Sequence, residues 1–410
     1  MKFDLLSLDF LQNPYPVYSW LRTNDPVHWH QDSQSNGMWL ITRYEDVASC
    51  LKDSRLSSGG RRGSHTLSTI DAEVREANKD FLEFYTKWLL FADPPHHTRL
   101  RKLANKGFTR GHVERLRPYM KGLAEGLLEK LPKSESVDFM QEFAVIMPAM
   151  VIVEMLGVPQ KDREKLVKWS NDVAALIGLM KVDVGVIQRI RKSYLAMTDY
   201  FMKHIEHLRA HPQDNVLSSM IEATEEDDSL SNDELYAQAV ILLIGGHETT
   251  RNLIGSGLHL LLTHPDQMMK LREHPELMNP AIEEILRYES PIQFIGRTAN
   301  EDFEIKGKQI KKGQVIMLML ASAHRDPDVF ANPDVFDIER DPNKHLAFGA
   351  GRHLCLGAPL GRVQGQVVLE AILNRYENIE LVGESVIWVS SPVFRGITSL
   401  HVSFETNHFR

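Results

Sequence analysis

The chain is poor in cysteine and has no long apolar run. Its 410 residues include two cysteines, Cys50 and Cys355, which lie far apart and argue against a disulfide framework. No apolar run reaches the roughly 18 residues that suggest a membrane span. The segment after Met1 lacks the basic and apolar regions of a signal peptide. We therefore expect a cytoplasmic protein with no membrane span.

Two further absences concern partners. A formal net charge of −8 argues against nucleic acid as a general partner. The chain contains neither a glycine-rich dinucleotide fingerprint nor a cysteine cluster for an iron–sulfur centre. Any redox chemistry at a metal in this chain would therefore need electrons from another protein.

One cysteine stands among regularly spaced glycines. Residues 348–357 read Phe-Gly-Ala-Gly-Arg-His-Leu-Cys-Leu-Gly, and an apolar pattern of helical period follows at once. The thiol of Cys355 is therefore expected at a helix N-terminus, where N–H groups favour an anion. A thiolate is the ligand that a soft metal needs. A lone cysteine is more often a small buried hydrophobe, which is our interpretation of Cys50, but the fixed spacing around Cys355 favours a ligand.

This segment resembles the haem-binding loop of the cytochrome P-450 superfamily, Phe-Gly-x-Gly-x-His/Arg-x-Cys-x-Gly, with every defining position filled. The resemblance implies that the thiolate of Cys355 binds the iron of haem b and favours O–O cleavage. It also implies that Phe348, His353 and Gly357 contribute to the haem site. The implied fold is mainly α (α+β), a helical prism with a minor β region, in a single domain over residues 1–410.

The arrangement of patterns along the chain agrees with that fold. Helical periodicity dominates from Asp93 to about Leu271, whereas strand patterns occur near both ends. Strands are expected near 27–29, 39–42, 303–305, 309–310, 315–320, 379–381 and 399–404. The resemblance therefore covers essentially the whole chain.

A long central helix is the clearest single element. Ser231 and Glu234 form a capping box, and the pattern predicts a helix to about Thr263, roughly 32 residues or about 48 Å long. Gly245 and Gly246 interrupt it at a cost of roughly 1 kcal/mol each relative to alanine. A close helix crossing or a kink is one explanation for such glycines.

The resemblance offers a second explanation. P-450 enzymes carry Ala/Gly-Gly-x-Asp/Glu-Thr in a helix that passes over the haem. It implies that Gly246 leaves room for O2, that Glu248 relays protons from solvent, and that Thr249 is the alcohol of the proton-delivery pair. Gly245 stands where alanine is commoner, and we expect a slightly wider groove there.

Three charged residues match a structural network of the family. Glu284 and Arg287 are three residues apart on one helical face. An exposed pair of this kind contributes little. The resemblance implies instead that the pair is buried, joined by Arg340, and holds the core that positions the Cys355 loop.

Four cationic side chains match positions that bind the haem propionates. They are His97, Arg101, Arg297 and His353. His97 and Arg101 stand four apart on one face of a helix. Arginine is usually a solvated surface residue, but its guanidinium suits carboxylate binding, and we expect all four to anchor haem.

Basic residues near the same segments indicate where an electron donor docks. In the family such a surface receives a ferredoxin or flavodoxin, which is served by its own reductase, and electrostatics steers the encounter. A charge cluster is otherwise a solvated face. The residues are Lys102, Lys106, Arg110, Lys344, Arg352 and Arg362.

The resemblance also implies a cavity for a hydrophobic small-molecule substrate. A polyketide or macrolide, terpenoid, steroid or fatty-acid skeleton would fit a mostly apolar lining. The resemblance implies that segment 57–92 borders the cavity. Its Arg61 and Arg62 could pair with a substrate carboxylate, but we expect them to face solvent. The expected lining residues are Ile241, Ile244, Ile292, Gln293, Ile295, Val393 and Phe394.

These observations predict a monooxygenase that activates O2 and hydroxylates or epoxidises its substrate. A hydrogen-peroxide-driven peroxygenase of the same fold generally lacks the acid–alcohol pair, so Glu248 and Thr249 argue against it. A non-catalytic haem-thiolate binding or sensing protein would need neither Thr249 nor a substrate cavity. A structural cysteine in a non-haem helical protein is the remaining alternative.

Cysteine ligation has a direct spectroscopic test. Carbon monoxide added to the reduced haem protein is expected to move the Soret band close to the position typical of a thiolate ligand, because the thiolate donates electron density to the iron. Cys355→Ala is expected to abolish that spectrum. A histidine-like spectrum from the unaltered protein would contradict cysteine ligation.

Overall fold

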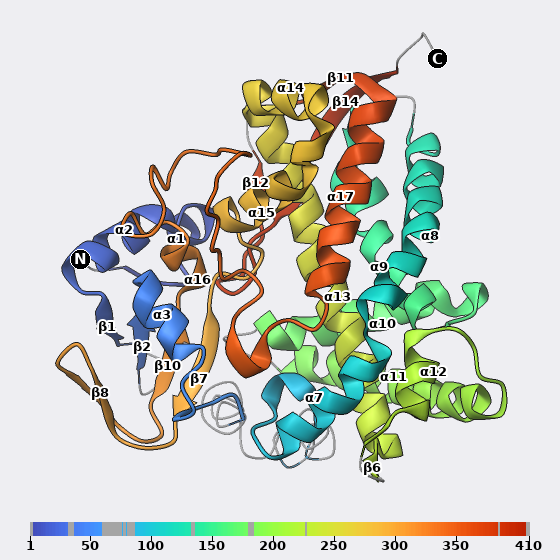
Figure 1. Cartoon of the computed structure of the whole chain (residues 1–410), viewed down its shortest axis with the longest axis horizontal. Coiled ribbons are helices and arrows are strands. Elements are labelled where there is room, and N and C mark those ends of the chain that lie inside the picture. The colour runs from blue at the N-terminus through green and yellow to red at the C-terminus, as the bar shows by residue number, and fades with distance from the viewer. Residues whose placement is uncertain are drawn as a thin grey trace.

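A helical bulk lies beside a smaller β region in the computed structural model of the chain (Figure 1). The structure describes residues 3–31, 37–59, 76, 79, 87–132, 136–178, 184–225, 228–383 and 386–406. Arg61, Arg62 and most of segment 57–92 lie outside the described residues. The expected mainly helical class with a minor β region is confirmed.

The helices keep the labels of Figure 1. The α-helices are α1 (Leu8–Gln12), α2 (Tyr15–Asn24), α3 (Tyr44–Cys50), α7 (His96–Gly107), α8 (Arg110–Glu129), α9 (Ile146–Met155), α10 (Arg163–Gly178), α11 (Val184–Ala210), α12 (Val216–Glu222), α13 (Asn232–Thr263), α14 (Pro265–Glu273), α15 (Met278–Tyr288), α16 (Leu320–Ala323) and α17 (Ala358–Arg375). The shorter helical turns are η1 (Leu89–Phe91), η2 (Met140–Ala144), η3 (Gln160–Asp162), η4 (Pro275–Leu277) and η5 (Gly351–His353).

In the described part of the chain, the strands form one five-stranded sheet and four smaller ones. Their bounds are β1 (Val27–His30), β2 (Met38–Ile41), β3 (Leu56–Ser57), β4 (Val137–Asp138), β5 (Thr224–Glu225), β6 (Asp228–Ser229), β7 (Ile295–Ala299), β8 (Phe303–Ile305), β9 (Lys308–Ile310), β10 (Val315–Leu318), β11 (Tyr376–Leu381), β12 (Ile387–Trp388), β13 (Ile397–Ser399) and β14 (His401–Thr406).

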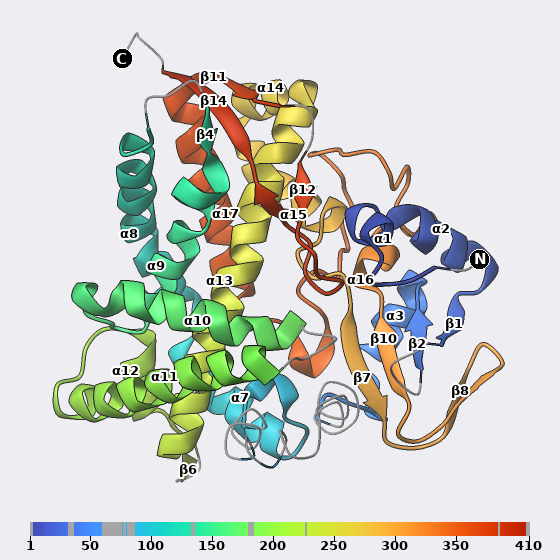
Figure 2. The same ribbon diagram turned by 180° about the vertical axis from the view of Figure 1, so that it is seen from behind.

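Helix α13 runs through the helical bulk. Its start is set by the expected capping box: the Ser231 hydroxyl accepts from the Glu234 N–H, and the Glu234 carboxylate accepts from the Ser231 N–H. Most of its apolar side chains are buried. Figures 1 and 2 show α17 on one side of α13, with α10 and α11 crossing it on the other. Such burial all round explains why the helix carries so few charges in its first half.

The largest sheet joins distant parts of the chain. Its strand order is β1-β2-β10-β7-β3; β10 runs parallel to β2 and antiparallel to β7. The expected strand over 315–320 is shorter than predicted: β10 ends at Leu318, and helix α16 starts at Leu320. The Met319 N–H still donates to Ile41, after which the apolar run turns into a short buried helix. Strand β7 carries Ile295 and Arg297 toward the site described below.

Cys50 ends helix α3 as a core residue. Its side chain is buried, and burial raises the pKa of its thiol to about 12. A thiol in that state is a poor nucleophile and a poor metal ligand near neutral pH. Among the described residues, no helix is both long enough and apolar enough to cross a membrane.

Candidate active site

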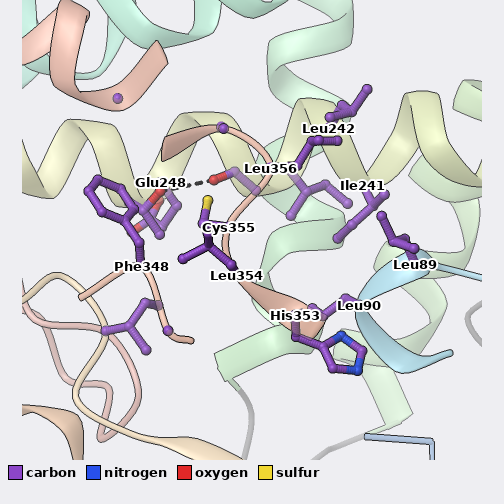
Figure 3. Close-up of a pocket in the computed structure, with 18 of the residues that line it drawn as sticks. Leu89, Leu90, Ile241, Leu242, Glu248, Phe348, His353, Leu354, Cys355 and Leu356 are labelled. Atoms are coloured by element: carbon purple, nitrogen blue, oxygen red, sulfur yellow. Dashed lines mark hydrogen bonds between the residues drawn. The ribbon is translucent and has the colours of Figure 1, made fainter. Parts of the chain in front are cut away.

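A cavity of about 340 Å³ brings the predicted site residues together. Helix α13 forms one wall, and segment 348–357 forms the opposite one (Figure 3). The sulfur of Cys355 points into the cavity, toward the side that α13 occupies. Its lining includes all ten residues predicted for catalysis or cofactor binding: His97, Arg101, Gly246, Glu248, Thr249, Arg297, Phe348, His353, Cys355 and Gly357.

The Cys355 loop is shaped by backbone hydrogen bonds and two left-handed glycines. Gly349 and Gly351 have φ of 70° and 69°, which side chains other than glycine rarely adopt. The Cys355 N–H donates to the Phe348 carbonyl at 2.9 Å, and the Gly349 N–H donates to the Leu346 carbonyl at 2.7 Å. Helix α17 begins three residues after the thiol, close to where the sequence pattern placed a helix start.

Burial and nearby positive groups have opposite effects on the pKa of the Cys355 thiol. Burial of the sulfur by surrounding protein raises the pKa of Cys355, although the residue itself is exposed to the cavity. The Gly357 N–H and the charges of Arg101 and Arg362 act to lower the pKa of this thiol. The protein alone therefore favours the thiol, and a bound metal is the stronger influence that would remove its proton.

One side of the cavity is rich in positive charge. Arg101 and His97 come from α7, Arg297 from β7, and His353 from η5. The His97 and His353 rings lie 4.2 Å apart between centroids. Burial, together with nearby arginines, lowers the pKa of His97 to about 4 and that of His353 to about 3. Both imidazoles are therefore neutral near pH 7, where each offers one N–H donor.

This cationic side of the cavity fits an anionic ligand. The buried Nε2 of His97 has no hydrogen-bond partner among the described residues. The nearby carboxylate of Asp93 does not pair with this nitrogen; it accepts hydrogen bonds from the N–H groups of Ser58 and Gly59, at 3.0 and 3.2 Å. Buried polar atoms and charges normally find partners. Two carboxylates on one flat, apolar ligand, such as the propionates of haem, would supply them.

Helix α13 presents an acid and an alcohol to the cavity. The Thr249 hydroxyl donates to the Gly245 carbonyl at 2.9 Å. Glu248 pairs with Arg251 at 2.5 Å, and both side chains are 19% exposed. Burial raises the pKa of Glu248, while Arg251 opposes that rise. A partly buried carboxyl of this kind exchanges a proton more readily near neutral pH than an exposed glutamate does.

The two glycines of α13 have different surroundings. A Cβ at Gly246 would overlap Ile152 of α9, whereas no described atom would lie within 4 Å of a Cβ at Gly245. The helix crossing therefore accounts for Gly246. Gly245 is the position whose missing side chain leaves room, whereas Gly246 lines the cavity and its predicted role beside O2 stays a prediction.

Glu284 is the centre of a buried ion network. Arg287 binds it through Nε and Nη2 at 2.7 and 2.8 Å, and both side chains are 0% exposed. Arg340 donates to the same carboxylate at 3.1 and 3.2 Å. The carboxylate also accepts from the Asp337 N–H and the Asn343 amide. Both arginines therefore bind the same carboxylate, and each of its two oxygens accepts hydrogen bonds.

This network continues into the Cys355 loop. Arg287 donates to the His324 carbonyl at 2.9 Å, and the His324 Nε2 accepts from the Leu346 N–H at 2.8 Å. The Leu346 carbonyl in turn accepts a hydrogen bond from the Gly349 N–H. Burial holds the pKa of His324 well below its ordinary value, so its ring stays neutral and can accept. A continuous chain of hydrogen bonds therefore links Glu284 to the first glycine of the loop.

The family model described as "Cytochrome P450" matches residues 37–387. The chain belongs to the cytochrome P-450 family. It is a haem-dependent monooxygenase that works with a separate redox partner and a hydrophobic substrate, as that family implies.

Named relatives cover almost the full length of the chain. "Polyketide biosynthesis cytochrome P450 PksS" of Bacillus subtilis is 36% identical over 97% of each chain. "Vitamin D(3) 25-hydroxylase" of Pseudonocardia autotrophica is 39% identical over 98% of this chain and 96% of that one. The structure of P450BioI with an acyl carrier protein that bears hexadec-9Z-enoic acid has a TM-score of 0.89 at 34% identity, over 97% of this chain and 99% of that one.

Six of the seven residues expected to contact substrate line the cavity of this P-450 protein. They are Ile241, Ile244, Ile292, Ile295, Val393 and Phe394. Gln293 is the exception and is corrected: it is absent from the lining and 3% exposed. Its amide donates to the Ser290 carbonyl at 2.9 Å and accepts from the Tyr18 hydroxyl at 3.3 Å. The polar side chain of Gln293 therefore makes its hydrogen bonds inside the protein core, although its neighbours in the sequence are apolar.

Sequence reasoning missed several residues of the site. Arg251 stands three residues after Glu248, so helical spacing alone would have suggested the pair. His324 carries no such signal, because its partner Leu346 is distant in sequence. Leu89, Leu90 and Phe91 also line the cavity, and an irregular segment without periodicity does not reveal which of its residues turn inward.

One basic residue expected at the donor surface is held by an acidic partner. Arg362 binds Glu283 through two nitrogens at 2.7 and 2.8 Å and lies over the Phe348 ring. Burial alone would raise the pKa of Glu283, but Arg362 and His345 lower it to about 2. Arg362 therefore fixes the Cys355 loop through its contacts with Glu283 and the Phe348 ring. Lys102, Lys106, Arg110 and Lys344 are exposed.

The buried network leads to a stability prediction. Glu284→Gln leaves Arg287 and Arg340 buried without a counter-charge, which typically costs about 3–5 kcal/mol of unfolding free energy. The loss is to be measured by urea denaturation of the haem-loaded protein. Asp199→Asn is the matched control, because it breaks an exposed Lys203–Asp199 pair and should cost less than about 0.5 kcal/mol. Equal losses in the two variants would contradict a structural role for Glu284.

Proposed function

We propose that this chain is a haem b monooxygenase in which Cys355 is the proximal iron ligand and Glu248 and Thr249 deliver protons on the opposite side. One observation carries the proposal: the thiol and the acid–alcohol pair belong to opposite walls of one largely apolar cavity (Figure 3). A haem between those walls would have the thiolate on one face and the acid and alcohol on the other.

The bound haem supplies the activation of O2, because a thiolate ligand donates electron density to iron and favours O–O cleavage. The chain holds the thiolate in place. The Cys355 loop is fixed by its own backbone bonds and by the chain from Glu284 through His324. Rigid ligands of this kind keep the coordination geometry of a metal constant.

The proposed propionate anchors are His97, Arg101, Arg297 and His353. Three observations support them: their shared side of the cavity, the neutral imidazoles of the two histidines, and the unpartnered Nε2 of His97 among the described residues. Arg101 also donates to the Leu354 carbonyl at 2.7 Å, next to the thiol. An anchor that touches both loop and ligand would align the macrocycle with Cys355.

Proton delivery is the proposed role of α13. Glu248 lies between the cavity and Arg251, with a pKa raised by burial. It can take a proton from the solvent side and pass it toward Thr249. The Thr249 hydroxyl donates to Gly245 and retains lone pairs that can accept. Delivery to the wrong atom at a metal centre yields peroxide, so position matters as much as acidity.

A ferredoxin or flavodoxin with its reductase is the proposed electron donor, and a cytoplasmic location remains a prediction. Lys102, Lys106, Arg110 and Lys344 are exposed near the segments that surround Cys355. With a chain charge of −8, a local basic surface would steer an acidic partner to this face and orient it.

The proposed substrate is a hydrophobic small molecule of polyketide, macrolide, terpenoid, steroid or fatty-acid type. The apolar lining supports this class. Relatives named for polyketide biosynthesis and for vitamin D(3) hydroxylation, and a structural neighbour with a fatty acyl chain on a carrier protein, lie within the same range. Hydroxylation or epoxidation is the proposed outcome.

Two other functions remain less well supported. A hydrogen-peroxide-driven peroxygenase would not need the Glu248–Thr249 pair, which lies at the cavity here. A haem-thiolate sensor would not need an extended apolar cavity beyond the thiol. Both alternatives leave those features without a role.

Thr249→Ala tests the proposed chemistry. Without the hydroxyl, protons should reach the wrong oxygen, so electrons should be diverted to peroxide while the carbon monoxide spectrum stays intact. The experiment uses a substrate found by its spin-state shift in a compound screen, with a ferredoxin system, and measures product and peroxide per electron pair. Thr263→Ala, near the far end of α13, is the control. Unchanged coupling in Thr249→Ala would remove Thr249 from the mechanism.

Arg251→Gln tests the acid. Removing this cation lets burial raise the pKa of Glu248 further, so the protonated carboxyl persists to higher pH. Where proton delivery limits the rate, coupled turnover should decrease at alkaline pH, and in Arg251→Gln the midpoint of this decrease should move to higher pH. In Glu248→Gln the decrease should disappear. A midpoint that stays the same in Arg251→Gln would exclude Glu248 as the titrating group.

A further inference from the structure

Outside the haem-facing residues, one buried ion pair touches the substrate wall directly. Arg395 donates through Nε to the Glu289 carboxylate at 3.0 Å, and the two side chains are 6% and 8% exposed. Arg395 immediately follows Val393 and Phe394, which line the cavity. We propose that the Glu289–Arg395 pair, with Tyr15, is a positioning device that sets the shape of this cavity wall and thereby the ligands it accepts. The inference rests on the proposed function, since the cavity must hold ligand beside haem.

The pair is enclosed by aromatic rings. The Tyr15 hydroxyl donates to Glu289 at 2.7 Å, and the Arg395 guanidinium lies 3.6 Å from the Trp388 ring centroid. Burial raises the pKa of Tyr15, so its hydroxyl stays protonated and remains a donor. Burial acts to lower the pKa of Arg395, but Glu289 and Tyr15 outweigh it and raise the pKa. The Arg395 guanidinium therefore stays charged, and the Tyr15 hydroxyl stays a donor, across the ordinary pH range.

Arg395 also joins the N-terminal helices to the wall. Its Nη1 donates to the carbonyls of Leu11 and Gln12, at 3.0 and 3.1 Å, where α1 ends. The Gln12 amide then exchanges two hydrogen bonds with the backbone of Trp388 in β12. One guanidinium thus holds the end of α1, the end of α15 and the segment before β13.

The wall segment is paired to the chain that follows α15. The Gln293 N–H donates to Val393 at 2.8 Å, and the Arg395 N–H donates to Pro291 at 2.9 Å. Ile292 and Phe394 form an isolated β-bridge between these bonds. Both paired segments contribute to the cavity, because Ile292, Val393 and Phe394 all line it.

Backbone bonds hold one half of this paired unit, because the Ala321 N–H donates to the Gln293 carbonyl at 3.1 Å and β7 begins at Ile295. The Arg395 side chain adds further contacts for the other half, segment 393–395. Glu289 stands at the end of α15 and fixes the unit to the helical core, while Tyr15 and the α1 carbonyls fix it from the other side. A buried charge pair tolerates few alternative geometries, because any shift leaves a desolvated charge without a partner. The ion pair therefore determines how far Val393 and Phe394 project into the cavity.

A neighbouring arginine provides a matched control. Arg325 is 5% exposed, pairs with Asp334 at 2.8 Å, and lies over the rings of Tyr15 and Tyr288. Among the described residues, its side chain contacts Tyr15 of α2, Tyr288 at the end of α15 and Asp334, and it makes no hydrogen bond to segment 391–396. Arg325→Lys should therefore affect stability in the same region without altering the wall.

The experiment compares two iron ligands of different reach in the haem-loaded protein. Imidazole fills the space beside the iron, whereas 4-phenylimidazole also places a ring against the cavity wall. Optical titration gives the dissociation constant of each. In Arg395→Lys, which keeps the charge but loses the planar set of donors, 4-phenylimidazole should bind about 5- to 10-fold more weakly, since lost apolar contact has effects of that size. Imidazole binding should change less than about 2-fold.

Tyr15→Phe is the milder second variant. It removes one hydroxyl from Glu289 and should fold even if Arg395→Lys does not. The dissociation constant of 4-phenylimidazole should rise about 2- to 3-fold, which corresponds to the loss of one modest hydrogen bond. The dissociation constant of imidazole should again stay unchanged. Thermal denaturation of each variant records the loss of stability separately.

The outcomes are distinct. A selective loss of 4-phenylimidazole affinity in Arg395→Lys and Tyr15→Phe, absent in Arg325→Lys, supports the inference. Equal weakening of both ligands, the same selectivity in Arg325→Lys, or unchanged constants despite lower thermal stability each overturn it. If the unaltered protein gives no spectral response to imidazole, the proposed function itself fails, and the inference falls with it.

Discussion

The organisation of the site depends on the buried carboxylate of Glu284. It binds two guanidinium groups and two further donors, and its side chain is fully shielded from solvent. Removing such a charge from water is costly unless every oxygen is used. The geometry around Glu284 is therefore constrained, and α15, residues 331–343 and the start of the Cys355 loop share that constraint. Through Arg287, His324 and Leu346 it extends to within three residues of Phe348.

The cavity combines three environments that a single ligand can join. One side holds the cations Arg101 and Arg297 beside the neutral imidazoles of His97 and His353, an apolar region surrounds the substrate space, and an acid–alcohol pair stands on α13. The thiol lies where these environments meet. Each part is weak evidence alone, since arginines, isoleucines and a threonine occur throughout proteins. Their convergence on one cavity is what supports the proposed chemistry.

Local patterns explain how much could be predicted. The capping box and the apolar periodicity located α13, whose bounds Asn232–Thr263 agree with the expected helix. The glycine spacing around Cys355 indicated a tight loop, and Gly349 and Gly351 do adopt left-handed backbone. The end of β10 was placed two residues too late, because an apolar run reads the same in a strand and in a short buried helix.

The contacts that were not predicted involve partners distant in the sequence. Gln293 is turned to Tyr18 and Ser290 instead of the cavity. Gly246 faces Ile152 of another helix, and Arg362 is held by Glu283. In each case the partner belongs to another element, so spacing along the chain carried no information about it.

By itself, the sequence determined the class of protein: the Cys355 loop, the Gly-Gly-x-Glu-Thr segment and the Glu-x-x-Arg pair are local features that together resemble one family. Only the tertiary structure decided which of these side chains share one cavity, which glycine leaves space, and which charges are neutralised by partners. It also revealed Glu289 and Arg395, more than a hundred residues apart, as a buried pair behind the substrate wall. The physical reason is that burial and pairing are properties of contacts between distant segments, and those contacts exist only once the chain has folded.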